Sequence, residues 1–530
     1  MKYDYIVVGA GSAGCVLANR LSENTKHTVA LIEAGGSDNH PWIHIPVGYI
    51  KTMAMPGVNW LFDSEPEPNT FNRSIPIPRG RGLGGSSSIN AMVYVRGQPD
   101  DYNGWGQMGN RGWSYDDILP YFKKSENFEM GYDEYRGIGG PLNVANTRQT
   151  YPFMDDLINA AVETGYGKAA DYNGKSQAGF NYFQVTQKNG LRFSAARAYL
   201  NPAKKRKNLH IIKNAHVTKV IIEGKVAKGI KYISNNVEES IFTKREVILS
   251  AGSIQSPQLL ELSGIGEPNL LKKNGIEVKQ DLIGVGENYQ DHYIARLVWR
   301  ASKRETLNEE LQGIGLVKQA LKFALFRRGA LTVTAGLVAG FVKSDNALAT
   351  PDIQYHIAPA SFADPKKRKL DKWPGLTIGP CQLRPHSRGS VHIKSIDPMA
   401  HPLIKPNFLS SEIDKQVLVK GMNIARDLVK APALRKWIDK EELPGSLEKT
   451  NDELLNYARQ TGATLYHPAG TCKMGHDEKA VVDDQLRVHG IKDLRVVDAS
   501  IMPKLVSGNT NAATIMIAEK GADLIRTRSD

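Results

Sequence analysis

His467 and Asn511 are the polar residues whose local sequence best suits chemistry on a small polar substrate. His467 lies in Leu465-Tyr466-His467-Pro468, and Pro468 restricts the residue before it to extended backbone, which fixes the direction of the imidazole. A histidine has a pKa near neutrality and can therefore take a proton from an alcohol. Asn511 stands at the expected start of the last helix, where it can cap the helix or project toward a ligand. Both side chains can touch one alcohol oxygen; a structural loop histidine and a simple helix cap are the alternatives.

A glycine-rich turn near the N-terminus predicts a dinucleotide site. Residues 9–14 are Gly-Ala-Gly-Ser-Ala-Gly, between an expected strand and an expected helix, and Glu33 ends the next strand 19 residues after Gly14. Gly9 permits the tight turn, Gly11 lets the backbone approach a pyrophosphate, and Gly14 lets helix and strand pack closely. The helix N-terminus offers free N–H groups to phosphates, and Glu33 would accept hydrogen bonds from ribose hydroxyls. This motif does not distinguish NAD from FAD.

Two further glycine clusters follow along the chain. Residues 80–90, Gly-Arg-Gly-Leu-Gly-Gly-Ser-Ser-Ser-Ile-Asn, form a loop whose backbone can press against a flat or charged ligand and whose N–H groups can bind an anion. The embedded Arg, Leu, Ile and Asn argue against a flexible linker. Residues 252–266 follow a buried strand and predict a turn, a helix and a glycine that ends the helix.

These two segments resemble the two signature patterns of the glucose-methanol-choline (GMC) oxidoreductase family. The segments Glu33-Ala34-Gly35-Gly36, 467–475 and 497–500 match the family as well, and the matches run in order from residue 4 to about residue 525. The bacterial choline-dehydrogenase-like and alcohol-dehydrogenase-like members are the most similar.

The resemblance implies that the cofactor is FAD, extended through the first domain. Some relatives attach the flavin covalently through a histidine just before the Asn of the glycine-rich loop; here that position is Ile89, so we expect non-covalent FAD. The predicted cofactor-binding residues are Gly9, Gly11, Ser12, Ala13, Gly14, Glu33, Ala34, Leu83, Asn90, Ala91, Val93, Val217, Asp498 and Ala499.

The resemblance also places the reacting centre. Family members carry a His-His or His-Asn pair, and this sequence resembles the His-Asn type, with His467 as base and hydrogen-bond partner and Asn511 orienting the alcohol oxygen. Flavin N5 would accept the hydride. A histidine similar to His356 lines the substrate cavity in some relatives, although a satisfied sheet histidine is equally consistent, and Tyr466 is expected to form a wall of that pocket. We interpret His292 as part of a structural motif and predict no metal site.

The elements that position these residues predict two α/β domains. Strand, helix and strand within residues 5–32 form one βαβ unit, and further strands are expected at 210–213, 216–222, 247–249, 352–358, 390–393 and 494–497. Helices are expected at 12–21, 256–262 and 511–525. We predict a Rossmann-type FAD-binding domain assembled from discontinuous segments and an α+β substrate-binding domain, with the flavin at their junction. The FAD-binding segments are 1–156, 205–292 and 465–530, and the substrate-binding segments are 157–204 and 293–464.

Composition narrows the class of protein. The length of 530 residues exceeds one ordinary core, and 41% hydrophobic with 23% charged residues indicates a folded chain. The net charge of +13 is spread along the chain; its two basic runs, 204–207 and 366–369, favour solvated loops, and no nucleic-acid-binding module is visible. Three sparse cysteines predict no disulfide framework, and no signal peptide or transmembrane segment is evident. We expect a cytoplasmic protein, either free or peripheral to the inner face of the membrane.

The predicted function is FAD-dependent oxidation of a primary alcohol to an aldehyde, with oxygen or a quinone or cytochrome as electron acceptor. Choline dehydrogenase proper, and a lyase of the same fold with a structural flavin, are alternatives. An NAD-dependent dehydrogenase would leave the 80–90 loop and the C-terminal segment without a role. A non-catalytic FAD-binding protein would leave His467 and Asn511 without one.

Overall fold

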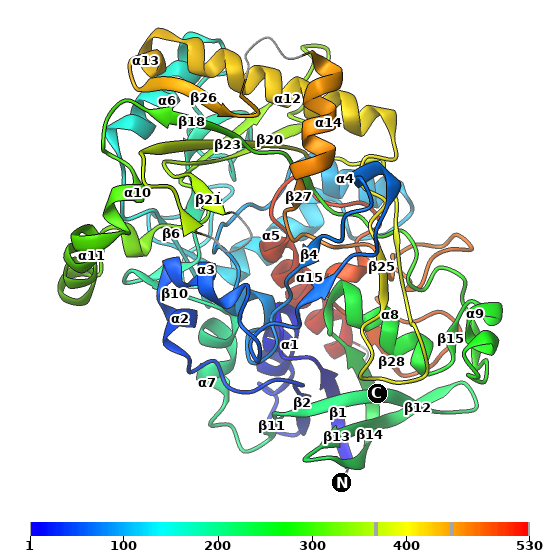
Figure 1. Ribbon diagram of the computed structural model, residues 1–530. Coiled ribbons are helices and arrows are strands. Elements are labelled where there is room, and N and C mark those ends of the chain that lie inside the picture. The colour runs from blue at the N-terminus through cyan, green and yellow to red at the C-terminus, as the bar shows by residue number, and fades with distance from the viewer. Residues whose placement is uncertain (1, 365–368, 446–449, 528–530) are drawn as a thin grey trace.

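The computed structural model describes residues 2–364, 369–445 and 450–527. The described strands gather into two large sheets, each covered by helices, and Figure 1 shows one sheet at the bottom beside both termini and the other at the top. Most of the basic run 366–369 lies outside the described residues, whereas Lys204, Lys205 and Lys207 are exposed, as a solvated loop requires.

The lower sheet has seven strands in the order β11-β2-β1-β14-β13-β12, with β28 paired to β14. Its strands are β1 (Lys2–Val8), β2 (Val29–Ile32), β11 (Leu209–Ile212), β12 (Ala215–Glu223), β13 (Val226–Ser234), β14 (Val237–Leu249) and β28 (Leu494–Val496). The part from β11 to β28 is parallel, and its apolar runs are buried, as parallel strands covered on both faces require. The strand predicted at 247–249 is only the end of β14, because the polar first half of β14, which pairs with β13, is exposed and lacks an apolar pattern.

The helices of this domain confirm the sequence patterns closely. Helix α1 (Ser12–Leu21) has the predicted bounds, α8 (Gly252–Leu262) begins four residues before the predicted helix, and α15 (Thr510–Arg526) begins one residue before it. Helix α15 is mostly buried and packs against α1 and α5 (Tyr115–Ser125). The other helices are α2 (Pro41–His44), α3 (Tyr49–Thr52), α4 (Pro99–Gln107), α6 (Pro152–Glu163), α7 (Asn201–Ala203), α9 (Pro268–Lys273), α10 (Leu307–Glu310), α11 (Gly313–Phe326), α12 (Glu412–Lys430), α13 (Pro432–Arg435) and α14 (Asn451–Thr461).

The upper sheet has eight strands in the order β26-β18-β23-β20-β19-β7, to which β17 and β27 are added beside β23. Its strands are β7 (Gly179–Tyr182), β17 (Tyr293–Ile294), β18 (Leu297–Ala301), β19 (Val338–Val342), β20 (Ile353–Ala358), β23 (Gly375–Gln382), β26 (Ile438–Leu443) and β27 (Ala463–Thr464). Helix α12 packs on β23 and covers this sheet from above in Figure 1. Each sheet therefore draws strands from separate chain segments, while the exact segment boundaries stay a prediction.

Short strands complete the described chain. They are β3 (Phe62–Asp63), β4 (Pro76–Ile77), β5 (Glu126–Phe128), β6 (Leu142–Asn146), β8 (Gln184–Val185), β9 (Gln187–Lys188), β10 (Leu191–Arg192), β15 (Ile265–Gly266), β16 (Gln280–Asp281), β21 (Phe362–Asp364), β22 (Lys369–Leu370), β24 (Ser390–His392) and β25 (Leu403–Lys405).

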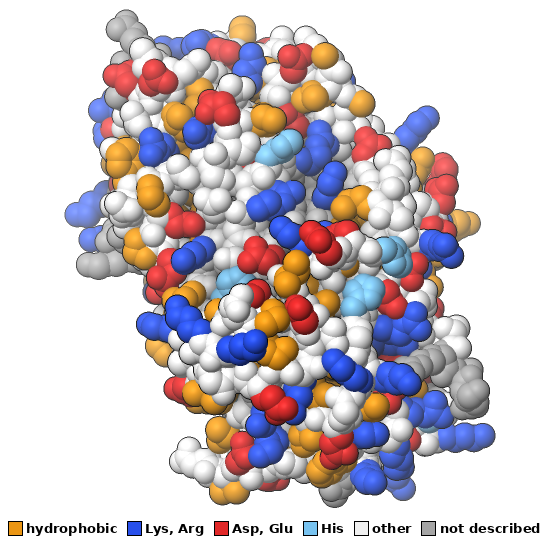
Figure 2. Space-filling model, turned by 90° about the vertical axis from the view of Figure 1, so that its right-hand side faces the viewer, with side chains coloured by type: hydrophobic (Ala, Val, Ile, Leu, Met, Phe, Trp, Pro, Cys, Tyr) orange, Lys and Arg blue, Asp and Glu red, His pale blue; other side chains and the backbone are white. Residues whose placement is uncertain are grey.

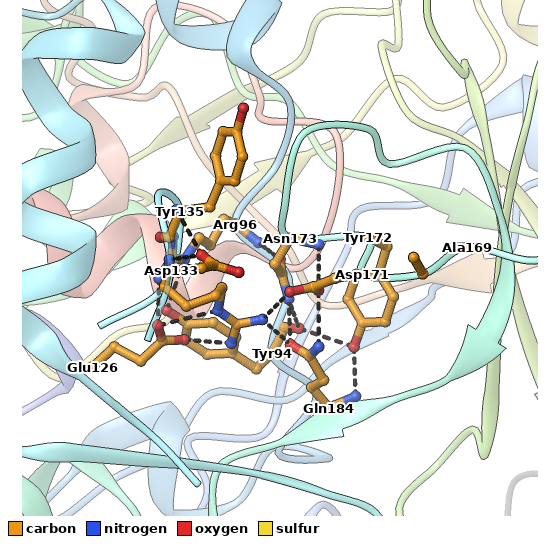
Figure 3. Close-up of polar contacts among 12 residues, drawn as sticks. Tyr94, Arg96, Glu126, Asp133, Tyr135, Ala169, Asp171, Tyr172, Asn173 and Gln184 are labelled. Atoms are coloured by element: carbon orange, nitrogen blue, oxygen red, sulfur yellow. Dashed lines mark hydrogen bonds and ion pairs between the residues drawn. The ribbon is translucent and has the colours of Figure 1, made fainter. Parts of the chain in front are cut away.

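A buried ion-pair network supports the segment that follows the 80–90 loop (Figure 3). The Glu126 carboxylate, fully buried, accepts from the guanidinium groups of Arg96 and Arg136, each at 2.6 Å. Arg136 also pairs with Asp171 at 2.7 Å and donates to Gln184. Two buried cations therefore depend on Glu126, because a buried charge without a partner is strongly destabilising.

We expect Glu126→Gln to lower the free energy of unfolding by about 3–5 kcal/mol, the usual cost of breaking a buried ion pair from one side. Urea unfolding followed by circular dichroism measures this. The exposed Glu134 gives a matched control, and Glu134→Gln should unfold as the wild type does. A Glu126→Gln protein within 1 kcal/mol of the wild type, the scale of an exposed pair, would contradict the role given to the network.

Candidate active site

The carboxyl ends of four parallel strands meet at one edge of the lower sheet. Val8 of β1 is in register with Ile32 of β2 and Leu249 of β14, and Leu249 is in register with Val496 of β28. The segments that leave these strands carry most of the predicted cofactor-binding residues. In open α/β sheets, ligands bind in the crevice at this edge.

The turn at residues 9–14 has the predicted geometry. Gly9 has φ +95°, and a Cβ there would lie 2.7 Å from the carbonyl oxygen of Ser250. A Cβ on Gly14 would lie 1.8 Å from the carbonyl oxygen of Gly9, so helix and strand pack too closely for any side chain. Helix α1 begins with no side-chain cap, which leaves the N–H groups of its first turn available to an anion.

The 80–90 loop packs directly on this turn. The Gly84 N–H donates to the carbonyl oxygen of Ala10 at 2.8 Å, and a Cβ on Gly85 would lie 2.6 Å from Cα of Gly11. Farther along, Asn90 accepts hydrogen bonds from the backbone of Met92 and from Arg192. The two glycine-rich segments therefore form one cradle of backbone groups.

The Glu33 carboxylate ties three turns of this cradle together. Its oxygens accept from the N–H groups of Ala10, Gly35 and Gly82 at 2.8–2.9 Å. Burial raises the pKa of Glu33, and these three hydrogen bonds counteract that rise. We predicted ribose hydroxyls as the partners of Glu33; the structure adds a role within the protein itself.

The other predicted cofactor-binding residues lie around the same edge. Asp498 accepts from the Gly252 N–H and the Ser256 hydroxyl, which joins the end of β28 to the start of α8. Val217 lies on β12, two residues after Ala215, whose N–H donates to the Glu33 carbonyl. With the uncapped helix and the glycine cradle, these residues fit a bound dinucleotide such as FAD.

His467 and His292 form a direct hydrogen bond at the interior of the molecule. Their Nδ1 atoms are 2.9 Å apart, and Nε2 of His292 lies 2.9 Å from the carbonyl oxygen of Leu383. A carbonyl only accepts, so His292 carries its proton on Nε2 and offers a lone pair at Nδ1. His467 must then donate from Nδ1, which leaves Nε2 of His467 as a hydrogen-bond acceptor.

Burial keeps both rings neutral near pH 7. It lowers the pKa of His292 to about 4 and the pKa of His467 well below its ordinary 6.5, which the neighbouring His292 lowers further. Asp291 holds the backbone of His467 in place, because one carboxylate oxygen accepts from the His467 N–H at 2.8 Å. Burial raises the pKa of Asp291 to about 6.

Asn509, not Asn511, is the amide beside His467. Nδ2 of Asn509 lies 3.0 Å from Nε2 of His467, and its Oδ1 accepts from Gln354, which fixes the direction of the amide. Asn511 instead accepts from the Ser12 hydroxyl at 2.8 Å, beside the dinucleotide turn. The cause of the difference is the start of α15 at Thr510: Asn509 is the N-cap residue with extended backbone, whereas Asn511 is already helical.

The two predicted substrate residues occupy different environments. His356 lies on β20, stacks on Phe183 at 5.3 Å, and its Nε2 has no hydrogen-bond partner within the described part of the chain. Burial lowers the pKa of His356 to about 3. Tyr466 is half-buried with φ +67°, and its carbonyl oxygen accepts from Arg79. An unpartnered buried imidazole is consistent with a cavity-lining group rather than a satisfied sheet residue.

The sequence interpretation missed Asn509, Gln354 and His292 as members of this cluster. Gln354 alternates with His356 on one strand, so their shared face was visible in the sequence. Nothing local distinguishes Asn509 from Asn511, or relates His292 to His467. Among the described residues, no three potential metal ligands form a cluster, and no helix is long and apolar enough to cross a membrane.

Comparisons with known proteins identify the family to which the chain is similar. Family models described as GMC oxidoreductase match residues 3–294 and 385–518. The chain is 43% identical to an alcohol dehydrogenase [acceptor] of Pseudomonas putida, over 100% of this chain and 96% of that protein. It is 41% identical to an oxygen-dependent choline dehydrogenase of Vibrio vulnificus, over 99% and 94%.

Solved structures give the same result. Pyridoxine 4-oxidase from Mesorbium loti superimposes with a TM-score of 0.91 at 29% identity, covering 100% of both chains. Formate oxidase superimposes with a TM-score of 0.92 at 26% identity, covering 99% and 98%. With its two sheets, its dinucleotide edge and these matches, the chain belongs to the GMC oxidoreductase family of FAD-dependent enzymes that act on CH–OH groups.

Proposed function

We propose that this enzyme oxidises neutral primary alcohols to aldehydes, with His467 as the base and Asn509, in place of Asn511, as the amide that orients the alcohol oxygen. The observation that carries the proposal is the neutral hydrogen-bond chain from Leu383 through His292 to His467, which ends at the Nε2 lone pair that accepts from the Asn509 amide.

An alcohol oxygen that replaces the direct hydrogen bond between Nδ2 of Asn509 and Nε2 of His467 can donate its own hydrogen bond to Nε2 and accept one from Nδ2. As Nε2 takes the hydroxyl proton, the carbon–hydrogen bond weakens and its hydrogen leaves with the electron pair, so that the carbonyl forms. FAD, when bound, supplies the hydride acceptor. His292 keeps the lone pair of His467 on Nε2, and Gln354 keeps Nδ2 of Asn509 directed at the substrate oxygen.

A neutral alcohol suits the charges around the pair better than choline does. The adjacent carboxylate, Asp291, is buried and enclosed by the His467 N–H and the hydroxyls of Thr464 and Tyr289, so the bulky quaternary ammonium group of choline does not reach it. We further propose His356 and Tyr466 as walls of the substrate pocket. The electron acceptor is oxygen or a quinone or cytochrome, which admission of air to the reduced enzyme distinguishes.

Location and domain limits belong to the same proposal. Three free, buried cysteines suit a reducing compartment such as the cytoplasm. We propose the same domain limits as the sequence predicts. The FAD-binding segments are 1–156, 205–292 and 465–530, and the substrate-binding segments lie between them.

Acid should release intact FAD from the purified protein, because Ile89 has no nucleophilic atom with which to bond the flavin.

Glu33→Ala should lose FAD and also lower the melting temperature of the FAD-free protein, since the N–H groups of Ala10, Gly35 and Gly82 lose their shared acceptor. Absorbance of the acid supernatant and thermal unfolding of the stripped protein measure the two effects. Flavin that remains with the denatured chain, or an unchanged melting temperature, argues against this account.

Anaerobic flavin reduction by a primary alcohol should separate the two asparagines. His467→Ala should slow reduction by about 10²–10⁴-fold, the usual contribution of a positioned base. Asn509→Ala should slow it by at least tenfold with FAD content unchanged, and the double variant should lose less than the product of the two effects. Asn511→Ala, two residues away, is the matched control and should affect FAD retention more than the reduction rate. If the flavin is reduced quickly in Asn509→Ala, and slowly in an Asn511→Ala variant that retains its full FAD content, then Asn511 is the residue that orients the alcohol oxygen.

The rate of flavin reduction should depend on pH only on the acid side of neutrality. Because burial lowers the pKa of His467 below 6.5, the base is already deprotonated at pH 7, and the rate should be constant from pH 7 to 9. It should fall only at lower pH, first as Asp291, with a pKa of about 6, is neutralised, and then as His467, whose pKa lies well below 6.5, gains a proton. Stopped-flow reduction across pH 5–9, with flavin content verified at each value, tests this. A limb centred above pH 7 would show that the base is not held neutral by burial.

A further inference from the structure

Helix α11 (Gly313–Phe326) stands apart from the rest of the molecule at the left of Figure 1. Only Phe323 among its residues is buried. The exposed apolar side chains are large, with exposed fractions of 77% for Ile314, 60% for Val317, 59% for Leu321 and 72% for Leu325. A contiguous apolar surface of this kind on a folded protein marks an interaction site.

These residues form one stripe along the helix. Positions 314, 317, 321 and 325 are separated by three or four residues, so they share one face, and Phe323 points to the other side. Phe323 is therefore the anchor of α11 to the protein, and the stripe faces outward.

The charged residues of α11 and of the turn directly after it are all basic. Between Glu310 and Asp345 the sequence contains no acidic residue, while Lys318, Lys322, Arg327 and Arg328 are exposed beside or just after the stripe. Among the described residues none of these four cations has a carboxylate within ion-pair distance. On the face shown in Figure 2, by contrast, acidic, basic and apolar side chains are mixed.

We propose that α11 docks the enzyme on an anionic lipid bilayer. An apolar stripe flanked by lysine and arginine suits insertion at the boundary between headgroups and acyl chains, where the cations meet lipid phosphates. The 14-residue helix is about 21 Å long, too short to span the bilayer, so it lies in the interface. A second copy of the chain is a poorer occupant, because symmetric pairing would bring like cations together.

The helix is connected to the cofactor side of the molecule. After α11, the turn Ala330–Thr332 packs against the turn Pro46–Gly48 next to α2. The Ile43 carbonyl of α2 accepts from Arg192, which also donates to Asn90 of the 80–90 loop. The docking of α11 on a bilayer does not depend on the proposed function. The further inference that docking favours an electron acceptor dissolved in the membrane rests on the proposed function.

Flotation of the FAD-loaded enzyme with vesicles tests the proposal. The wild type should float with phosphatidylcholine–phosphatidylglycerol vesicles at a 3:1 ratio and remain largely unbound with pure phosphatidylcholine. Leu321→Ser/Leu325→Ser should lower the partition coefficient at least tenfold, since two exposed leucines no longer enter the bilayer. Lys318→Gln/Lys322→Gln should lower it about tenfold on the anionic vesicles only.

Matched controls lie elsewhere on the surface. Ile396→Ser/Met399→Ser removes side chains that are 63% and 54% exposed, and Lys272→Gln/Lys273→Gln removes two cations of α9; both should bind as the wild type does. All variants should oxidise an alcohol with a water-soluble dye at the wild-type rate, which separates docking from the proposed chemistry. The proposal is overturned if the wild type does not float, if the leucine variant floats unchanged, or if sedimentation reveals a wild-type dimer that the leucine variant dissociates.

Discussion

The buried carboxylate of Glu33 is the contact on which the cofactor edge depends. Located where β2 ends, it accepts from the turn after β1, from its own loop and from the 80–90 loop, which is distant in sequence. Each of these N–H groups would otherwise be buried without a partner, and such groups cost about 1–3 kcal/mol each. The three turns are therefore held together by hydrogen bonds within the protein itself. A preformed cradle of this kind reduces the ordering that binding must otherwise impose.

The reacting pair depends on both sheets in a different way. His467 and Asn509 come from the last chain segment, Gln354 lies on β20 of the upper sheet, and the Leu383 carbonyl follows β23. His292 lies just before β17, at the crossing between the two domains. The proposed alcohol site therefore draws its residues from both sheets and from separate segments of the chain.

The sequence was sufficient for the architecture and for part of the site. The apolar run and the glycines of residues 5–21 predicted β1 and α1 because a buried parallel strand and a tight turn leave strong local patterns. The amide partner of His467 could not be predicted, because it depends on where α15 begins: the start at Thr510 makes Asn509 the N-cap residue and places Asn511 inside the first turn. The tautomer of His467 depends on the carbonyl of Leu383, far away in sequence, and no local pattern contains that information. The role of Glu33 within the protein was missed for the same reason.

The first turn of α15 carries two asparagines with different partners. Asn509 contacts His467, the proposed base, and Asn511 contacts Ser12 in the turn predicted to hold the pyrophosphate. Asn509 is the N-cap residue of α15 and Asn511 lies in its first turn, and α15 packs against both α1 and α5. The proposed alcohol site and the predicted dinucleotide turn therefore both contact the start of α15. A change that tilts this helix would displace both contacts together.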